Sequence, residues 1–272
     1  TRWVEHESGG YWDYCDFPLR DATLEEIEAW PMPSPDDFDY SQIPVDCRKL
    51  QDYCVCLNAM PDIINATGMI RTMEQVLIDL ITDDEAGMRY LDRKMAIQTE
   101  ILERSLEAAK GGVDLLLLGE DLGTQRSPMI SLEIFRKHIR SRHQPYVDQA
   151  RTYGAIPMEH TCGYSSWAYE DFIEMGVQAV DTLQPEATNM NPAYLKEHFG
   201  GRLGFHGCIS TAGPLAYGTP DDVVRDVRDT LEILMPGGGY ALAPTHAIQD
   251  NSPTENVLAM YEAARTYGVY GR

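Results

Sequence analysis

The chain has 272 residues, of which 43% are hydrophobic and 24% charged, as in ordinary soluble globular proteins. Its 43 Asp and Glu residues against 22 Lys and Arg give a formal net charge of −21, which argues against a nucleic-acid-binding surface. No run approaches the roughly 18–20 apolar residues of a membrane span, and no secretory leader pattern opens the chain, so we expect a cytoplasmic protein. Because the chain opens on Thr1 rather than Met, we also expect some upstream sequence to be missing.

The first fifty residues differ in pattern from the rest of the chain. Residues 1–19 are rich in aromatic side chains and predict a β-hairpin that turns at Gly9–Gly10. Residues 30–44 are rich in Pro and Asp and predict an ordered surface strap. We therefore expect two regions, with residues 1–50 forming the hairpin and strap and residues 51–272 forming the main domain.

The main domain opens with a short strand and two helices. Residues 53–58 are a strand candidate, and a Met- and Ile-rich helix follows them. A long helix over about residues 84–110 comes next, and Asp83 or Asp84 is placed to cap it.

From about residue 112 onwards one unit of sequence recurs. A glycine is followed by a short apolar run that ends in polar residues, and then by a helical pattern. The apolar runs are too short for buried helices and are flanked by Gly and Pro, so they predict strands. The five runs are VDLLLLGED (113–121), AIPMEHTC (155–162), VQAVDTLQPE (177–186), RLGFHGCIS (202–210) and YALAPTHAIQ (240–249). Together with residues 53–58 they give six strands.

Helix-capping residues open several of the segments between these strands. Ser131 is placed as an N-cap, and a second helix starts at Thr219 with Pro220 in its first turn. A third helix starts in the same way at Ser252, where Glu255 would complete a capping box. Strands that alternate with helices indicate a parallel sheet and an α/β fold.

His160 and Cys162 stand at the end of one predicted strand, separated by one residue. Side chains alternate between the two faces of a strand, so both point the same way. Imidazole and thiolate both suit Zn²⁺, and a catalytic zinc site typically has three protein ligands and an open position. Taken alone, the pair is a weak signal that fits a buried histidine beside a small buried thiol better than it fits a metal site. Without a leader, the six cysteines are expected to be reduced thiols, some of them able to bind metal.

Several stretches resemble the uroporphyrinogen decarboxylase superfamily and occur in the same order. They are residues 115–139, 158–163, 181–211 and 237–268. The resemblance implies a TIM-type (β/α)8 barrel with its active site at the carboxyl ends of the strands. A closed barrel needs two strands more than the six found here. We therefore expect one or two N-terminal βα units of the barrel to be absent from this chain.

Two branches of that superfamily are compatible with the sequence. One decarboxylates a porphyrinogen without a cofactor, and holds its substrate with N-terminal arginines, an Asp and a Tyr. The other moves methyl groups between corrinoids and thiols, with zinc held by a His-x-Cys pair and a later Cys. In this context we favour metal binding by His160 and Cys162. At the place of the decarboxylase Tyr, Thr67 is the nearest match.

The resemblance leaves the third zinc ligand open. Where the methyltransferase branch carries its late Cys, this chain has His246, which is what the decarboxylase branch shows. His246 could be the third ligand or a catalytic residue of a lyase. Cys208 is the reserve ligand, with a buried apolar thiol as the alternative. His206 shares the strand face of Cys208, and we expect it either to bind substrate or to be structural.

Three further polar residues end predicted strands. Asp121 precedes a glycine at a rim loop, so we assign it a catalytic role in orienting substrate or supporting the histidine, with a loop-bracing role as the alternative. Glu120 is a candidate for substrate binding, although adjacent strand residues face opposite sides. Gln184 could bind substrate or brace a ligand.

The leading hypothesis is a zinc-dependent methyltransferase that moves a methyl group between a corrinoid and a thiol or related acceptor. The alternatives are a cofactor-free decarboxylase-like lyase of porphyrin metabolism, and a non-catalytic member that binds a tetrapyrrole or a partner. The expected cofactor is zinc, with a corrinoid such as methylcobalamin as co-substrate. The expected partners are a small-molecule substrate, a corrinoid-carrying protein and a second copy in a homodimer, without nucleic acid or membrane. The basic cluster at residues 136–143 predicts a solvated helix face or, alternatively, a docking patch for an acidic partner.

Overall fold

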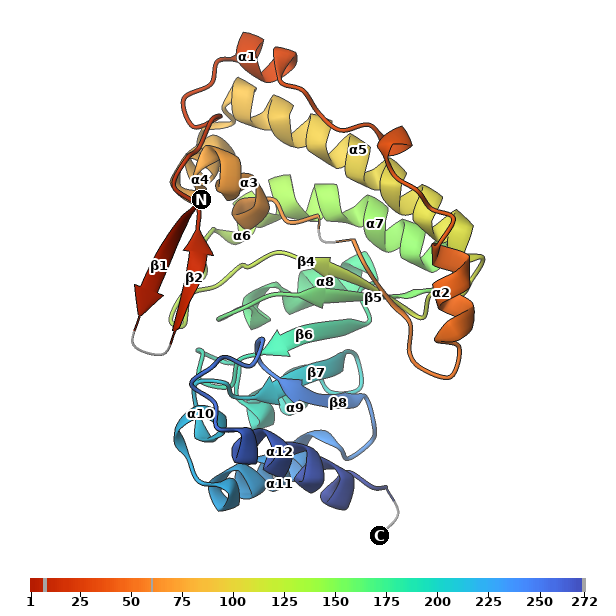
Figure 1. Cartoon of the computed structure of the whole chain (residues 1–272), viewed down its shortest axis with the longest axis vertical. Helices are drawn as coiled ribbons and strands as arrows, with labels where there is room; N and C mark the ends of the chain where they lie inside the picture. Colours follow the sequence, from red (N-terminus) through yellow and green to blue (C-terminus); the bar gives the residue numbers. More distant parts are fainter. Residues whose placement is uncertain (7–8, 60, 271–272) are drawn as a thin grey trace.

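A computed structural model describes residues 1–6, 9–59 and 61–270 of the chain (Figure 1). Its centre is a curled parallel sheet in which six strands follow one another in chain order. The strands are β3 (Cys56–Asn58), β4 (Leu115–Gly119), β5 (Ile156–His160), β6 (Ala179–Leu183), β7 (Gly204–Ile209) and β8 (Tyr240–Pro244). The predicted α/β fold with a parallel sheet is therefore confirmed, and the curl of the sheet is that of a half-barrel.

The register of the sheet places three polar residues in one row. His160 of β5 is paired with Asp181 of β6, which is paired in turn with His206 of β7. Paired residues of parallel strands present their side chains on the same face. Among the described residues the sheet does not close, since β3 and β8 form its two edges without pairing with each other.

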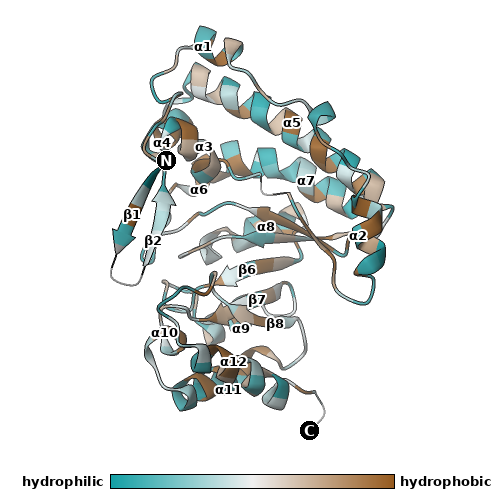
Figure 2. Cartoon of the chain, in the orientation of Figure 1, coloured by the Kyte–Doolittle hydropathy of each residue, from teal (hydrophilic) through white to brown (hydrophobic). Residues whose placement is uncertain are grey.

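Helices cover the outer face of the sheet. The long helix α5 (Glu85–Ala109) and α7 (Ser141–Thr152) pack side by side on the β4–β5 side (Figure 1). The main hydrophobic core lies between helices and strands, where Figure 2 shows the strands as largely hydrophobic. No helix in the described part of the chain is both long and apolar enough to cross a membrane. The remaining helices after β4 are α6 (Leu132–Ile134), the π-helix η2 (Phe135–Arg140), the 3-10 helix η3 (Ser166–Ala168), α8 (Tyr169–Met175), α9 (Pro192–Phe199), α10 (Pro214–Tyr217), α11 (Pro220–Leu234) and α12 (Thr254–Tyr267).

The Pro- and Asp-rich segment lies along α5. Arg93 of α5 donates to the carbonyl of Trp30, and Arg104 pairs with Asp36 at 2.6 Å. The short elements that precede α5 are α1 (Leu24–Ala29), the 3-10 helix η1 (Pro35–Asp37), α2 (Ile43–Lys49), α3 (Ile64–Arg71) and α4 (Met73–Thr82). Asp84 caps α5 by accepting from a backbone N–H of its first turn. Of the two residues predicted for this cap, Asp83 and Asp84, the structure therefore shows Asp84.

The N-terminal hairpin consists of β1 (Arg2–His6) and β2 (Gly9–Asp13) and stands apart from the sheet in Figure 1. The predicted turn at Gly9–Gly10 is wrong, because both glycines are paired residues of β2. Gly10 is needed for packing instead: a Cβ there would lie 2.4 Å from the indole of Trp3. That indole meets Trp12 edge to face, with 5.6 Å between ring centroids.

Of the three helix caps predicted between and after the later strands, two are present. Ser131 caps α6, and Thr219 opens α11 with a complete capping box. The predicted cap at Ser252 is wrong, because α12 begins after Pro253 and lacks a side-chain cap. The backbone N–H of Ser252 instead closes a turn onto the carbonyl of Gln249.

Candidate metal centre

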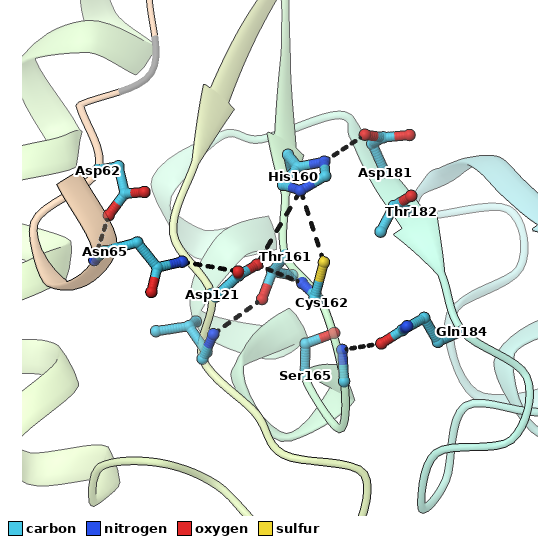
Figure 3. Close-up of polar contacts among 12 residues, drawn as sticks. Asp62, Asn65, Asp121, His160, Thr161, Cys162, Ser165, Asp181, Thr182 and Gln184 are labelled. Carbon is cyan, nitrogen blue, oxygen red and sulfur yellow. Dashed lines mark hydrogen bonds and ion pairs between the residues drawn. The ribbon is translucent and has the colours of Figure 1, made fainter. Parts of the chain in front are cut away.

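Three ligand-type side chains converge at the carboxyl ends of β4 and β5. Asp121, His160 and Cys162 place one ligand atom each within 4.8 Å of the others. The Cys162 Sγ lies 3.7 Å from the His160 Nε2, which lies 4.0 Å from the Asp121 Oδ1 (Figure 3). All three side chains are partly buried, at the strand ends where active sites of such folds lie.

The ring of His160 is fixed from behind by Asp181. The Nδ1 of His160 lies 2.6 Å from the Asp181 Oδ2, and an ionised carboxylate can only accept, so Nδ1 carries the proton. The Nε2 therefore faces Cys162 and Asp121, and it offers a lone pair to them when the imidazole is neutral. A carboxylate that holds the far nitrogen of a histidine is the usual support of a metal-binding imidazole.

Charges around the centre shift its pKa values in opposite directions. Burial lowers the pKa of His160, but the hydrogen bond and charge of Asp181 and the charge of Asp121 outweigh it, so the pKa is raised overall. Burial raises the pKa of the Cys162 thiol strongly, and the charges of Asp121 and Asp181 raise it further. Without a cation, therefore, the thiol keeps its proton.

Asp121 is held in place by two donors. Its Oδ1 accepts from the backbone N–H of Cys162 at 2.8 Å, and its Oδ2 accepts from the Asn65 side chain at 2.7 Å. Asn65 lies in the first turn of α3, so the carboxylate ties α3 to the loop after β5 (Figure 3). Asp121 was expected to orient substrate or to support the histidine; its position within 4.8 Å of both the His160 and Cys162 ligand atoms was not predicted.

Glu120 does not face the centre, which corrects its assignment to substrate binding. Its side chain is 1% exposed and accepts from the backbone N–H groups of Ile63 and Ile64 at 2.7 and 2.9 Å. It thus binds the N-terminus of α3, where a carboxylate is favoured. Burial raises the pKa of Glu120 well above its ordinary value.

Gln184, which follows β6, braces the loop that carries Cys162. Its Oε1 accepts from the backbone N–H of Gly163 at 2.6 Å. Gly163 has a φ of +69°, and a Cβ there would lie 2.2 Å from the carbonyl oxygen of Gly123. The bracing role, one of the two predicted for Gln184, is the one that this contact supports.

His206 shares Asp181 with His160. Its Nδ1 lies 2.5 Å from the Asp181 Oδ1, and its side chain lines a groove of about 630 Å³ on the inner face of the sheet. Met158 and Phe205 are among the apolar residues of that groove. Asp181 was not predicted, although an acidic residue inside the apolar strand AVDTL is a signal that could have identified it.

The two predicted third ligands lie outside the group of three. Cys208 is 1% exposed and belongs to the hydrophobic core, with φ at +74° after Gly207 at +111°. This irregular backbone turns its side chain away from the face that strand alternation predicted. His246 lies in the exposed segment after β8, and its Nδ1 lies 3.3 Å from the carbonyl oxygen of Ala247.

The three arginines of the basic cluster at residues 136–143 form ion pairs within the protein. Arg136 and Arg140 both pair with Asp171 of α8. Arg142 pairs with Asp92 of α5 at 2.7 Å. These ion pairs join η2 to α8 and α7 to α5.

Comparisons with known proteins agree with the predicted resemblance. A family model described as uroporphyrinogen decarboxylase (URO-D) matches residues 63–267. Among solved structures, a methyltransferase from Methanosarcina mazei is similar, with a TM-score of 0.63 at 20% sequence identity. The match covers 84% of this chain and 63% of that chain, so this chain spans less than two thirds of that protein. The likeness at this identity shows a shared fold. No curated protein gave a significant match.

Proposed function

The chain belongs to the uroporphyrinogen decarboxylase family, and from this premise we propose that it is a zinc-dependent methyltransferase acting between a corrinoid and a thiol. The observation that carries the proposal is the convergence of Asp121, His160 and Cys162 within 4.8 Å. The methyltransferase fold of the Methanosarcina mazei protein is consistent with it.

The three side chains fit a zinc ion by their chemistry. Imidazole nitrogen, thiolate sulfur and carboxylate oxygen are all zinc ligands, and three of them leave the open position of a catalytic site. The contact of His160 with Asp181 supplies the outer support that such ligands need. We therefore propose Asp121 as the third ligand, in place of His246 or Cys208.

The centre would activate the acceptor thiol. A bound zinc ion supplies the positive charge that keeps a coordinated thiol as its thiolate near neutral pH. Asp181 keeps the proton of His160 on Nδ1, so that the opposite nitrogen stays available. The contacts of Asp121 with Asn65 and with the Cys162 backbone hold the carboxylate beside His160.

The six strands are proposed to be part of a TIM-type barrel. The sheet curls as a barrel wall does, and β3 and β8 are its open edges in the described residues. Further strands between these two edges would convert the groove beside His206 into an enclosed barrel interior. The corrinoid would then approach from the carboxyl ends of the strands, where the metal centre lies.

The contacts favour this function over a cofactor-free decarboxylase. The groove is lined largely by apolar side chains and by Asp181, whose carboxylate opposes the carboxylates of an acidic porphyrinogen. Thr67, at the place expected for the decarboxylase Tyr, is 1% exposed and accepts from Lys94 instead of facing the centre.

Metal analysis of the purified chain tests the proposal. We expect near-stoichiometric zinc that is lost in His160→Ala, Cys162→Ser and Asp121→Ala. The controls His246→Ala and Cys208→Ser should keep it, because neither side chain belongs to the group. Methyl transfer from methylcobalamin to a thiol should require the metal. Protein without zinc, or fully active after its removal, would overturn the proposed function.

A further inference from the structure

A buried polar cluster lies on the outer side of the sheet, behind the metal centre. His143 of α7 is 1% exposed, and its Nδ1 lies 3.1 Å from the Glu159 Oε1 of β5. Its Nε2 lies 3.7 Å from the Glu120 Oε2 at the end of β4. One imidazole therefore forms a hydrogen bond with β5 and lies within ion-pair distance of the carboxyl end of β4, where its Nε2 has no hydrogen-bond partner among the described residues.

Each glutamate of this cluster directly precedes a residue of the metal centre. Glu120 precedes Asp121, and Glu159 precedes His160. Successive residues of a strand point to opposite faces, so the glutamates point outward to α7 while the next residues point inward. Contacts that fix the glutamates behind the sheet thus also fix the spacing of the ligands in front of it.

The cluster is also connected to the metal centre through the first turn of α3. Glu120 accepts from the backbone N–H groups of Ile63 and Ile64. Asn65, the next residue, donates its side-chain amide to Asp121. Glu120 and Asp121, which are adjacent in the chain, therefore both accept hydrogen bonds from the N-terminal end of α3.

Such a cluster is costly for stability alone. Glu120 and Glu159 are fully buried, and burying ionisable groups costs free energy that apolar side chains of similar volume would not cost. The apolar residues Tyr146 and Val147, both 0% exposed, already pack α7 against the core. A directional contact such as the hydrogen bond between His143 and Glu159 is useful here if the positions of the strand ends must be fixed.

We propose that His143 is a positioning residue of the metal centre, which holds the ends of β4 and β5 at the spacing that brings Asp121 beside His160 and Cys162. The consequence for metal affinity rests on the proposed function. The effect of His143 on the spacing of the strand ends is independent of that function, because the hydrogen bond from the Cys162 N–H to Asp121 joins the two strand ends without any metal.

Amide hydrogen exchange in the metal-free protein tests this geometry. In His143→Phe we expect the exchange of the Cys162 N–H to accelerate by roughly tenfold more than global stability explains. The matched control is Val147→Ala, one turn further along the same buried face, which weakens packing without touching the cluster. Glu159→Gln, whose amide oxygen can still accept from His143, should retain protection of this amide.

The outcomes decide the inference separately from the proposed function. If the Cys162 amide is no less protected in His143→Phe than in Val147→Ala at equal stability, the inference is wrong. Should His143→Phe fail to fold, Glu159→Leu cuts the same contact from β5 and is judged by the same criterion. Zinc affinity is the second measurement, with an expected loss of roughly 10–100-fold in His143→Phe and no loss in Val147→Ala. If the parent chain binds no zinc, the proposed function fails, and the exchange result still decides the role of His143.

Discussion

The Nδ1 of His160 lies 2.6 Å from the Oδ2 of Asp181, on the side of the ring opposite to the metal centre. This contact sets which nitrogen of His160 is free. In Asp181→Asn the amide offers one oxygen and one NH2 group, so only one of the Nδ1–H groups of His160 and His206 can still donate to it, and the other ring must change its tautomer or its orientation. We expect zinc affinity to fall roughly 10–100-fold, measured by competition with a chelator. His206→Gln, which spares the contact of His160, should bind zinc like the parent.

The same contact predicts a pH dependence of stability in the metal-free protein. Burial would raise the pKa of Asp181, but its hydrogen bonds and ion pairs with His160 and His206 lower it from 3.8 to about 2. Its contribution is present above pH 3.8 and is lost as the pH falls through 2. The pKa of His160 is raised, so its contribution is complete below 6.5 and is lost as the pH rises through the folded-state value.

Urea unfolding of the parent and Asp181→Asn checks this window. The free energy of unfolding should differ most, by about 2 kcal/mol, between roughly pH 4 and 6.5. The difference should shrink below that window and above it. A difference that stays constant from acid to alkaline pH would contradict the assigned interactions.

Cys162 should react slowly with alkylating reagents in the metal-free protein. Burial and the charges of Asp121 and Asp181 raise the pKa of its thiol, and the thiolate is the reactive form. Mass spectrometry should find the exposed Cys15 alkylated by iodoacetamide well before Cys162. In Asp121→Asn one of the opposing charges is gone, and the modification of Cys162 should accelerate. Equal rates in the parent and the variant would show that this charge does not act on the thiol.

Gly163 should be intolerant of a side chain. Its φ is +69°, and an added Cβ would lie 2.2 Å from the Gly123 carbonyl oxygen. We expect Gly163→Ala to cost about 2–3 kcal/mol of unfolding free energy and to weaken zinc binding through the Cys162 loop. Gly154→Ala is the control that separates backbone strain from steric clash. Gly154 also has a positive φ, of +81°, but an added Cβ there would have no atom within 4 Å. This substitution should cost about 1 kcal/mol and leave zinc affinity unchanged.

Much of the fold follows from local sequence patterns. The six strands were predictable because each is a short apolar run bounded by glycine or polar residues, a pattern that does not depend on distant contacts. The pairing of His160 with Cys162 followed from strand alternation. The cap at Ser252 failed because a turn onto Gln249 uses its backbone and Pro253 takes the cap position.

The full centre was harder to predict because it depends on register between strands. Asp181 lies beside His160 only through the pairing of β5 with β6, and spacing along the chain carries no information on that pairing. Cys208 was misplaced because Gly207, at φ of +111°, breaks the alternation of β7. His246 was considered for its position in a family pattern, and a family pattern fixes neither loop path nor side-chain direction.

In the described part of the chain the sheet has two open edges, which affects how the protein behaves in concentrated solution. An outer strand such as β8 presents backbone donors and acceptors that can be paired by a strand from another molecule. Pro244 at the end of β8 removes one donor, and β3 is only three residues long, so both edges offer short templates. Self-association through these edges should therefore be weak, reversible and dependent on protein concentration, and light scattering over a dilution series would reveal it.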